Sequence, residues 1–225
     1  MKNMYIYHAH ISEEKTRRLI KCFAMDLTGT QTAELVRLNL NTVDRIFNKI
    51  RIRILENSQA IFIERSEFEA GEGHFSSRKG QRKHVHGADE KIIVIGLYGR
   101  KGKVYTEIVP NDKAKALQAI IRGQADIKDV IYTPGWRNYD ALVELGHEKV
   151  FRVHHDSNEG SSGCDIHINE VESFWRYAKR RFAKFKGIPK DKYELYLRET
   201  EFRFNARGQN IYLILLKELR DNPLN

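Results

Sequence analysis

The order in which extended and helical patterns follow one another after residue 57 constrains this fold most. Residues 92–98 are almost wholly apolar, and residues 104–109 alternate apolar with polar side chains, so both segments predict strands. The four residues between 98 and 103, Gly99-Arg100-Lys101-Gly102, predict a hairpin turn. The same reasoning predicts strands over 61–66, 130–133 and 150–153, and helices over 113–122, 139–145, 167–181, 191–204 and 211–219.

Three strands that can meander, followed by helix, strand, helix, strand and helix, predict an α/β fold. Its mixed sheet is flanked by helices in the order found in ribonuclease-H-like domains. Such domains place one acid at the end of the first strand, one just after the fourth, and one on the helix after the fifth. Together these acids hold two divalent metal ions that act on a phosphodiester. The predicted helix over 167–181 is therefore the place to look for the third acid.

Residues 167–181 place the acid Glu172 on a helix with a basic continuation. Residues three or four apart share a helix face, so Glu172, Arg176 and Lys179 line up along one side. The side chains expected to face inward are Val171, Trp175 and Ala178. A carboxylate beside cations suggests metal-assisted phosphate chemistry. The spacing also fits an amphipathic helix whose acid simply pairs with Arg176.

The first 57 residues have a helical pattern. Ser12 predicts the N-cap of a helix that extends to Met25, and a short helix over 31–37 leads through a tight turn to a helix opening at Asn41 or Thr42. Two helices joined by a tight turn, the second of them basic, predict a helix-turn-helix DNA-binding domain. A plain three-helix bundle used for packing or dimerisation fits the same pattern.

The expected division is therefore a DNA-binding domain over 1–57 and a ribonuclease-H-like domain with C-terminal helices over 58–225. The side chains expected to face base edges are Asn41, Asp44, Arg45 and Asn48, and Lys49 is a further expected DNA contact.

The charge balance favours a polyanionic partner. The chain has 39 Lys and Arg against 30 Asp and Glu, a formal net charge of +9, which points to nucleic acid. Cations expected to contact DNA phosphates are Arg78, Lys79, Arg82 and Lys83 in a glycine-punctuated stretch, and Arg180 and Arg181 after Glu172. For the stretch around residue 80, a surface loop without such a role is an equally good interpretation.

Cysteine usage and hydropathy place the expected location inside the cell. Cys22 and Cys164, the only cysteines, lie far apart in sequence, which excludes a disulfide framework and a four-thiolate zinc site. No apolar run approaches the roughly twenty residues that span a bilayer. We expect no membrane association and a cytoplasmic protein at the bacterial nucleoid.

Five motifs resemble those of bacterial insertion-sequence transposases of the DDE type. They are GKVYTEIVPN (102–111), GWRNY (135–139), FRVHH (151–155), HINEVESFWRYAKRR (167–181) and EFRFNAR (201–207). They occur in the right order around predicted elements, over most of the chain from Ile61 onward. The resemblance implies an enzyme that joins insertion-sequence ends to target DNA with Mg²⁺ or Mn²⁺, and that generally acts as a homo-oligomer on double-stranded DNA.

The resemblance also assigns site residues. Glu172 matches the third, metal-binding acid, and Lys179 matches a lysine on the same helix used near DNA phosphate. Ser66 stands where the first Asp of an Asp-Glu pair is expected, and Pro134 stands where an Asp precedes the Gly-Trp-Arg motif. A hydroxyl is a weak neutral ligand and proline has no side-chain donor, so two charges that would bind magnesium are missing.

The sequence thus predicts a transposase with impaired catalysis. The alternative is a non-catalytic DNA-binding relic or repressor that recognises terminal inverted repeats. Ribonuclease activity on RNA–DNA hybrids shares the fold but lacks the same acids.

Overall fold

The computed structural model describes most of the chain, in eight segments. They are residues 3–58, 67–76, 91–99, 102–109, 130–134, 150–153, 169–185 and 188–225. The chain divides into two compact units, Met1–Gln59 with Arg198–Asn225, and Ala60–Leu197. The predicted helices over 113–122 and 139–145 lie outside the described residues. Within the described residues, no helix has the length and apolar character to cross a membrane.

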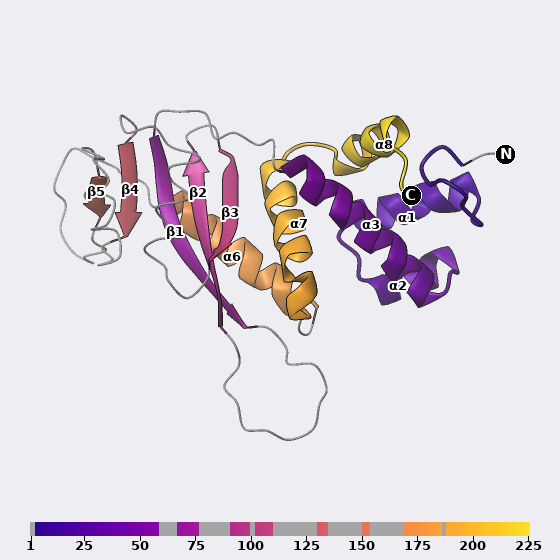
Figure 1. Cartoon of the computed structure of the whole chain (residues 1–225), viewed down its shortest axis with the longest axis horizontal. Helices are drawn as coiled ribbons and strands as arrows, with labels where there is room; N and C mark the ends of the chain where they lie inside the picture. Colours follow the sequence, from indigo (N-terminus) through magenta and orange to yellow (C-terminus); the bar gives the residue numbers. More distant parts are fainter. Residues whose placement is uncertain are drawn as a thin grey trace, which may run out of the picture. The chain divides into compact units, whose positions relative to one another are not determined.

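The first unit is helical (Figure 1). Its helices are α1 (Glu13–Ala24), α2 (Gly29–Val36), α3 (Leu40–Ser58) and α8 (Ile211–Asp221), with the part of α7 (Tyr193–Asn205) that begins at Arg198. The core contains apolar side chains from α1, α3 and α8, and the rings of Phe23 and Phe47 meet edge to face with centroids 5.0 Å apart. Cys22 is buried and forms no disulfide within the described residues, and burial raises the pKa of its thiol.

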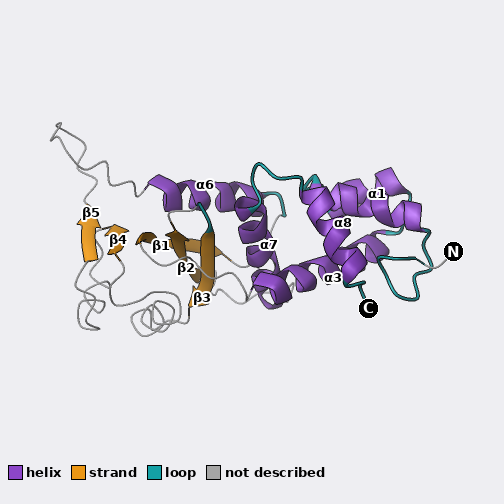
Figure 2. Cartoon of the chain, turned by 90° about the horizontal axis from the view of Figure 1, so that it is seen from above, coloured by secondary structure: helices purple, strands orange, loops and turns teal. Residues whose placement is uncertain are grey.

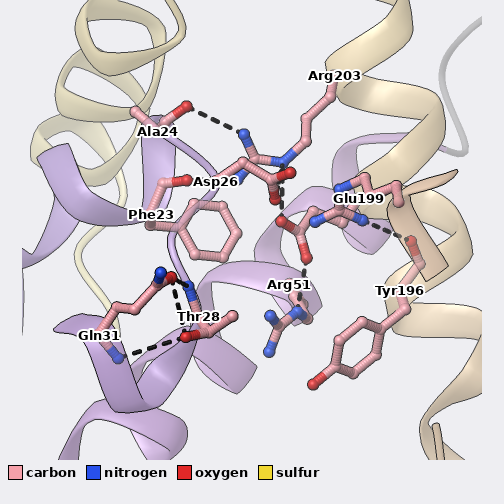
Figure 3. A network of polar contacts seen from close by, with 10 residues as sticks. Phe23, Ala24, Asp26, Thr28, Gln31, Arg51, Tyr196, Glu199 and Arg203 are labelled. Atoms are coloured by element: carbon pink, nitrogen blue, oxygen red, sulfur yellow. Dashed lines mark hydrogen bonds and ion pairs between the residues drawn. The ribbon is translucent and has the colours of Figure 1, made fainter. Parts of the chain in front are cut away.

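Side-chain caps explain where the first helices begin. Ser12 accepts a hydrogen bond from the Lys15 amide, which confirms Ser12 as the predicted N-cap. Thr28 and Gln31 form a capping box, so α2 begins at Gly29, two residues earlier than predicted (Figure 3). Residues 37–39 join α2 to α3. The helices lie where the sequence predicted them, while their role in binding DNA stays a prediction.

Replacing Thr28 by alanine should lower the stability of the helical unit by about 1 kcal/mol, because the Gln31 amide loses its side-chain acceptor. The urea midpoint measured by circular dichroism reports this change. Thr30→Ala is the matched control, since Thr30 is exposed within α2 and alanine is the better helix former. Equal losses for the two variants would contradict a capping role for Thr28.

Residues 198–225 pack with the N-terminal helices. Leu215, Leu219 and Leu224 belong to the same buried cluster as residues of α1 and α3. Backbone hydrogen bonds also tie Leu224 to Tyr5 and Tyr7. The compact units therefore differ from the expected division at residue 57, because the apolar side of α8 completes the core of the N-terminal helices. The assignment of residues 1–57 as the DNA-binding domain stays a prediction.

The second unit contains a mixed five-stranded sheet. Its strands are β1 (Glu67–Ser76), β2 (Lys91–Gly99), β3 (Val104–Val109), β4 (Val130–Pro134) and β5 (Val150–Val153). The order is β3-β2-β1-β4-β5, in which β1, β2 and β3 are antiparallel neighbours and β4 and β5 run parallel to β1. Helix α6 (Asn169–Ala183) lies along one face of the sheet (Figure 2). This confirms the predicted α/β fold with ribonuclease-H-like strand order.

The position of the first strand was predicted wrongly. The β-rich run 61–66 was expected to form it, but β1 begins at Glu67. Residues 67–76 have weak strand propensity because they include three acids and two glycines. Pairing along the whole of β2 and burial under α6 outweigh that weakness. The other four strands lie within one residue of their predicted bounds, because each is a short, strongly apolar or alternating run.

Candidate active site at the first turn of α6

The amphipathic pattern predicted for α6 is confirmed. Val171, Trp175 and Ala178 are buried, with 1%, 6% and 0% of their surface exposed. Glu172, which follows Val171 in the first turn, is half-buried, and Lys179 is exposed two turns later. The helix therefore places its apolar stripe on the sheet, with the half-buried Glu172 beside the stripe and Glu170 exposed in the same turn.

Trp175 fills a slot formed by three glycines of β1 and β2. A Cβ atom at Gly73 would lie 2.6 Å from two ring carbons of Trp175, and one at Gly96 would lie 2.7 Å from another. At Gly71, which pairs with Gly96, a Cβ would lie 3.1 Å from Trp175 Nε1 and 3.0 Å from a methyl of Val171. Only strands without side chains at these positions let the indole approach the sheet so closely.

Glu69 of β1 holds the first turn of α6. Its carboxylate accepts a hydrogen bond from the Val171 amide at 3.1 Å, and the residue is only 9% exposed. A buried carboxylate at a helix N-terminus is stabilised by the free amides and the helix dipole. Glu69 thus fixes the turn that carries Glu172. Sequence reasoning missed this role because residues 67–76 were not expected to form the strand under α6.

A ring cluster fixes the second half of α6 to the same strand. Phe75 of β1 meets Phe182 of α6 edge to face, with centroids 5.0 Å apart, and Tyr193 packs 5.2 Å from Phe182. Burial raises the pKa of the Tyr193 hydroxyl far above its usual range. Tyr193 is therefore a neutral packing residue and not an acid–base group.

Of the two positions predicted to have lost their acids, one can be placed. Pro134 ends β4 and pairs with Val153 of β5, which agrees with a position at the carboxyl end of the fourth strand. Ser66 lies outside the described residues, and the strand that it was expected to end begins after it.

The sheet register identifies another β1 position near Pro134. β1 pairs with β4 from Glu67 opposite Val130 to Glu69 opposite Tyr132. Continuing that register by two residues brings Gly71 level with Pro134. Gly71 also belongs to the face of β1 under α6, because a Cβ there would touch Val171, the neighbour of Glu172.

These residues do not fit a pair of divalent metal ions. Magnesium in such sites needs several carboxylate oxygens. Neither Gly71 nor Pro134 has a side-chain donor atom, and the Glu69 carboxylate bonds to the helix amide. Among the described residues, no group of three or more His, Cys, Asp or Glu side chains could hold a metal ion.

The predicted DNA-binding cations have different surroundings. Arg45 on α3 and Arg180 on α6 are exposed, whereas Lys49 donates to the backbone carbonyl of Asn225. Arg181 is 3% exposed, with its guanidinium 5.2 Å from the Phe185 ring centroid and a hydrogen bond to the Tyr196 carbonyl. This burial argues against a DNA contact by Arg181. Arg78, Lys79, Arg82 and Lys83 lie outside the described residues.

Two curated proteins resemble this chain. An uncharacterized transposase-like protein of Haemophilus influenzae is 40% identical over 121 residues, which cover 53% of this chain and 94% of that protein. An uncharacterized protein in transposable element ISH50 of Halobacterium salinarum is 29% identical over 118 residues, covering 52% of this chain and 40% of that protein.

Two solved structures of Mos1 transposase also match. A pre-cleavage Mos1 transpososome has a TM-score of 0.31 at 10% identity, and a paired-end complex with the left transposon end has a TM-score of 0.33 at 12% identity. Each match covers 95% of this chain and 78% of the other. At such low TM-scores, the fold rests on the sheet order described above.

The family match covers the sheet, α6 and α7. Residues 67–205 match the ISXO2-like transposase domain, beginning at the first residue of β1 and ending at the last residue of α7. The matched range includes Glu172 and Pro134 and excludes Ser66. The chain therefore belongs to the family of ISXO2-like transposase domains.

Proposed function

We propose that this chain is an insertion-sequence transposase whose metal-dependent cleavage and strand transfer are impaired by the loss of two acids. The observation that carries the proposal is the register of β1 and β4, which pairs Glu69 with Tyr132 and, continued by two residues, brings Gly71 level with Pro134. A Cβ at Gly71 would touch Val171 in the first turn of α6. Glu172 is the remaining acid of the site, and Lys179 supplies an exposed cation on the same helix. Mg²⁺ or Mn²⁺ is the metal that a complete set of acids would hold.

Gly71 is a better candidate than Ser66 for the position of the first acid. The family match starts at Glu67, so it includes Gly71 and excludes Ser66. Gly71 precedes Glu72, which agrees with the Asp-Glu pair expected from the resemblance. Gly71 also faces α6, whereas alternate residues of a strand such as Ala70 and Glu72 face away.

Restoring both acids should restore chemistry. The substrate is DNA that carries the inverted repeats of the chain's own element, and the assay contains Mn²⁺. The wild-type chain should give no strand-joined product, whereas the double variant Gly71→Asp with Pro134→Asp should form that product. Each acid contributes at least about tenfold, because metal-held charges stabilise the transition state directly. Single-turnover cleavage of end-labelled DNA measures this.

Two further variants make the assay specific. Ser66→Asp with Pro134→Asp adds the same charge and should stay inactive, and Glu172→Ala should abolish the activity of the repaired chain. Product from Ser66→Asp with Pro134→Asp, but not from Gly71→Asp with Pro134→Asp, would show that residue 66 is the position of the first acid. Full activity of the wild-type chain would refute impairment.

The second candidate is a non-catalytic DNA-binding protein, either a relic or a repressor, that recognises terminal inverted repeats. It is favoured by the net charge of +9 and by the exposed Arg45 on α3, next to the exposed Asn41 and Asp44. This candidate keeps the partner, double-stranded DNA, and needs no metal. Assembly as a homo-oligomer on DNA and a cytoplasmic location at the nucleoid also stay predictions.

DNA binding can be tested without catalysis. Arg45→Ala should weaken binding to the inverted repeat about tenfold and reduce the salt dependence of the association constant, because one phosphate or base contact is lost. Fluorescence anisotropy between low and physiological salt measures both quantities. Lys21→Ala removes an exposed cation from α1 and is the matched control. Equal losses for the two variants would argue against α3 as the reading helix.

A further inference from the structure

The indole N–H of Trp175 is buried without a hydrogen-bond acceptor among the described residues. The residue is 6% exposed, and Nε1 is shielded from solvent. Buried indole N–H groups normally find a partner, because an orphaned donor loses its hydration without compensation. The apolar part of the ring is well packed, since it lies against Phe174 and Phe75 with centroids 4.9 and 6.0 Å away.

The orphaned N–H lies beside one particular backbone position. A Cβ at Gly71 would be 3.1 Å from Nε1, whereas the three atoms nearest to a Cβ at Gly73 or at Gly96 are all carbons of aromatic rings. The other neighbours of the Gly71 Cβ are the two methyls of Val171, at 3.0 and 3.2 Å. Of these three glycines, only Gly71 therefore has a polar atom among the nearest neighbours of its Cβ position.

The geometry selects the length and chemistry of that side chain. A carboxylate oxygen lies two bonds beyond Cβ, so it can turn to hydrogen-bond distance from Nε1 while Cβ stays near its ideal position. Alanine has no acceptor, and glutamate would need an extra methylene in a slot whose contacts are already tight. An aspartate is the acidic residue that matches the orphaned donor.

We propose that Trp175 is a positioning residue for an aspartate carboxylate at position 71, to which its indole N–H donates. The bond directs one oxygen of that carboxylate toward α6 and leaves the other for a cation. In this chain, glycine at position 71 leaves the indole N–H without the acceptor for which it is placed.

The hydrogen bond is tested by NMR on the whole chain. The ¹H–¹⁵N spectrum shows one indole signal each for Trp175 and Trp136, and Trp175→Phe identifies the former. In Gly71→Asp the Trp175 indole proton should move downfield and exchange about ten times more slowly, the protection expected of a bond to a charged acceptor. Gly71→Ala, which adds Cβ without an acceptor, should show neither change.

Other outcomes decide against the proposal. Equal chemical shifts and equal exchange rates of the Trp175 indole proton in Gly71→Asp and Gly71→Ala would refute the proposed hydrogen bond. So would a Gly71→Asp chain that is unfolded by circular dichroism while Gly71→Ala is folded, because the slot would then not accept the carboxylate. Gly71→Asn supplies a neutral acceptor of the same shape and should give a smaller downfield shift than Asp.

The proposal rests on the proposed function only for the role of the carboxylate in holding metal. Mn²⁺ binding to Gly71→Asp with Pro134→Asp, followed by water proton relaxation, tests that part separately. A shifted indole signal with no Mn²⁺ binding would uphold the hydrogen bond and contradict the metal site. Mn²⁺ binding with an unshifted indole would contradict the role of Trp175 and uphold the site.

Discussion

Glu199→Ala is expected to destabilise the helical unit by about 3 kcal/mol, because it leaves two buried guanidinium groups without their shared carboxylate. Glu199 accepts from Arg51 Nε at 2.7 Å and from Arg203 Nε at 2.8 Å, and its side chain is 1% exposed. Figure 3 shows the Glu199 carboxylate between the two arginines, with Arg203 also reaching the backbone carbonyls of Phe23 and Ala24 at the end of α1.

The loss should be far larger than for an exposed ion pair. Glu13→Ala is the matched control, since Glu13 pairs with Arg17 on the surface of α1 at 3.1 Å and contributes at most about 0.5 kcal/mol. Urea unfolding monitored by far-ultraviolet circular dichroism compares the two. Glu199→Gln, which keeps the acceptor oxygen, should fall between them. A loss for Glu199→Ala as small as that for Glu13→Ala would show that the network adds no stability.

Arg203 of α7 has a structural role, because it is 5% exposed and bonded to Glu199 and to the backbone of α1. Its guanidinium also lies 4.9 Å from the centroid of the Phe23 ring. It therefore joins α7 to the N-terminal helices in the core of the helical unit.

Gly96→Ala is expected to cost about 3 kcal/mol in the sheet unit, because overpacking a rigid contact forces either the strand or the indole to move. The new Cβ would lie 3.2 Å from Trp175 Cη2 and 2.7 Å from Cζ2, and the second distance is shorter than carbon atoms can pack. Gly71→Ala is the control, since its contacts, 3.0 and 3.2 Å to the Val171 methyls and 3.1 Å to Trp175 Nε1, are longer and need shifts of only a few tenths of an ångström. Thermal unfolding and near-ultraviolet circular dichroism measure the two effects.

A double variant separates steric overlap from loss of strand conformation. In Gly96→Ala with Trp175→Phe, the smaller ring leaves room for the methyl group. The stability lost on adding Gly96→Ala to the Trp175→Phe variant should therefore be half or less of the stability lost on adding it to the wild-type chain. An unchanged cost would mean that the glycine is required for the backbone and not for the indole.

The sequence predicted most elements of the described fold from local signals. The apolar run of β2, the alternation of β3 and the cap at Ser12 each specify an element without reference to distant residues. The inward face of α6 and the position of Glu172 follow from helical spacing in the same way. The order of the strands then indicated the sheet topology.

Only the tertiary structure decided what β1 is and where the candidate site lies. Residues 67–76 look unlike a strand, and they form one because β2 pairs with residues 68–76 and Trp175 fills the space that their glycines leave. The register of β1 with β4, which no local pattern specifies, pairs Glu69 with Tyr132 and, continued by two residues, brings Gly71 level with Pro134. The burial of Arg203 and the packing of α8 on the N-terminal helices depend on contacts between residues more than 150 positions apart. A local pattern specifies an element, whereas partners distant in sequence become neighbours only when the elements pack.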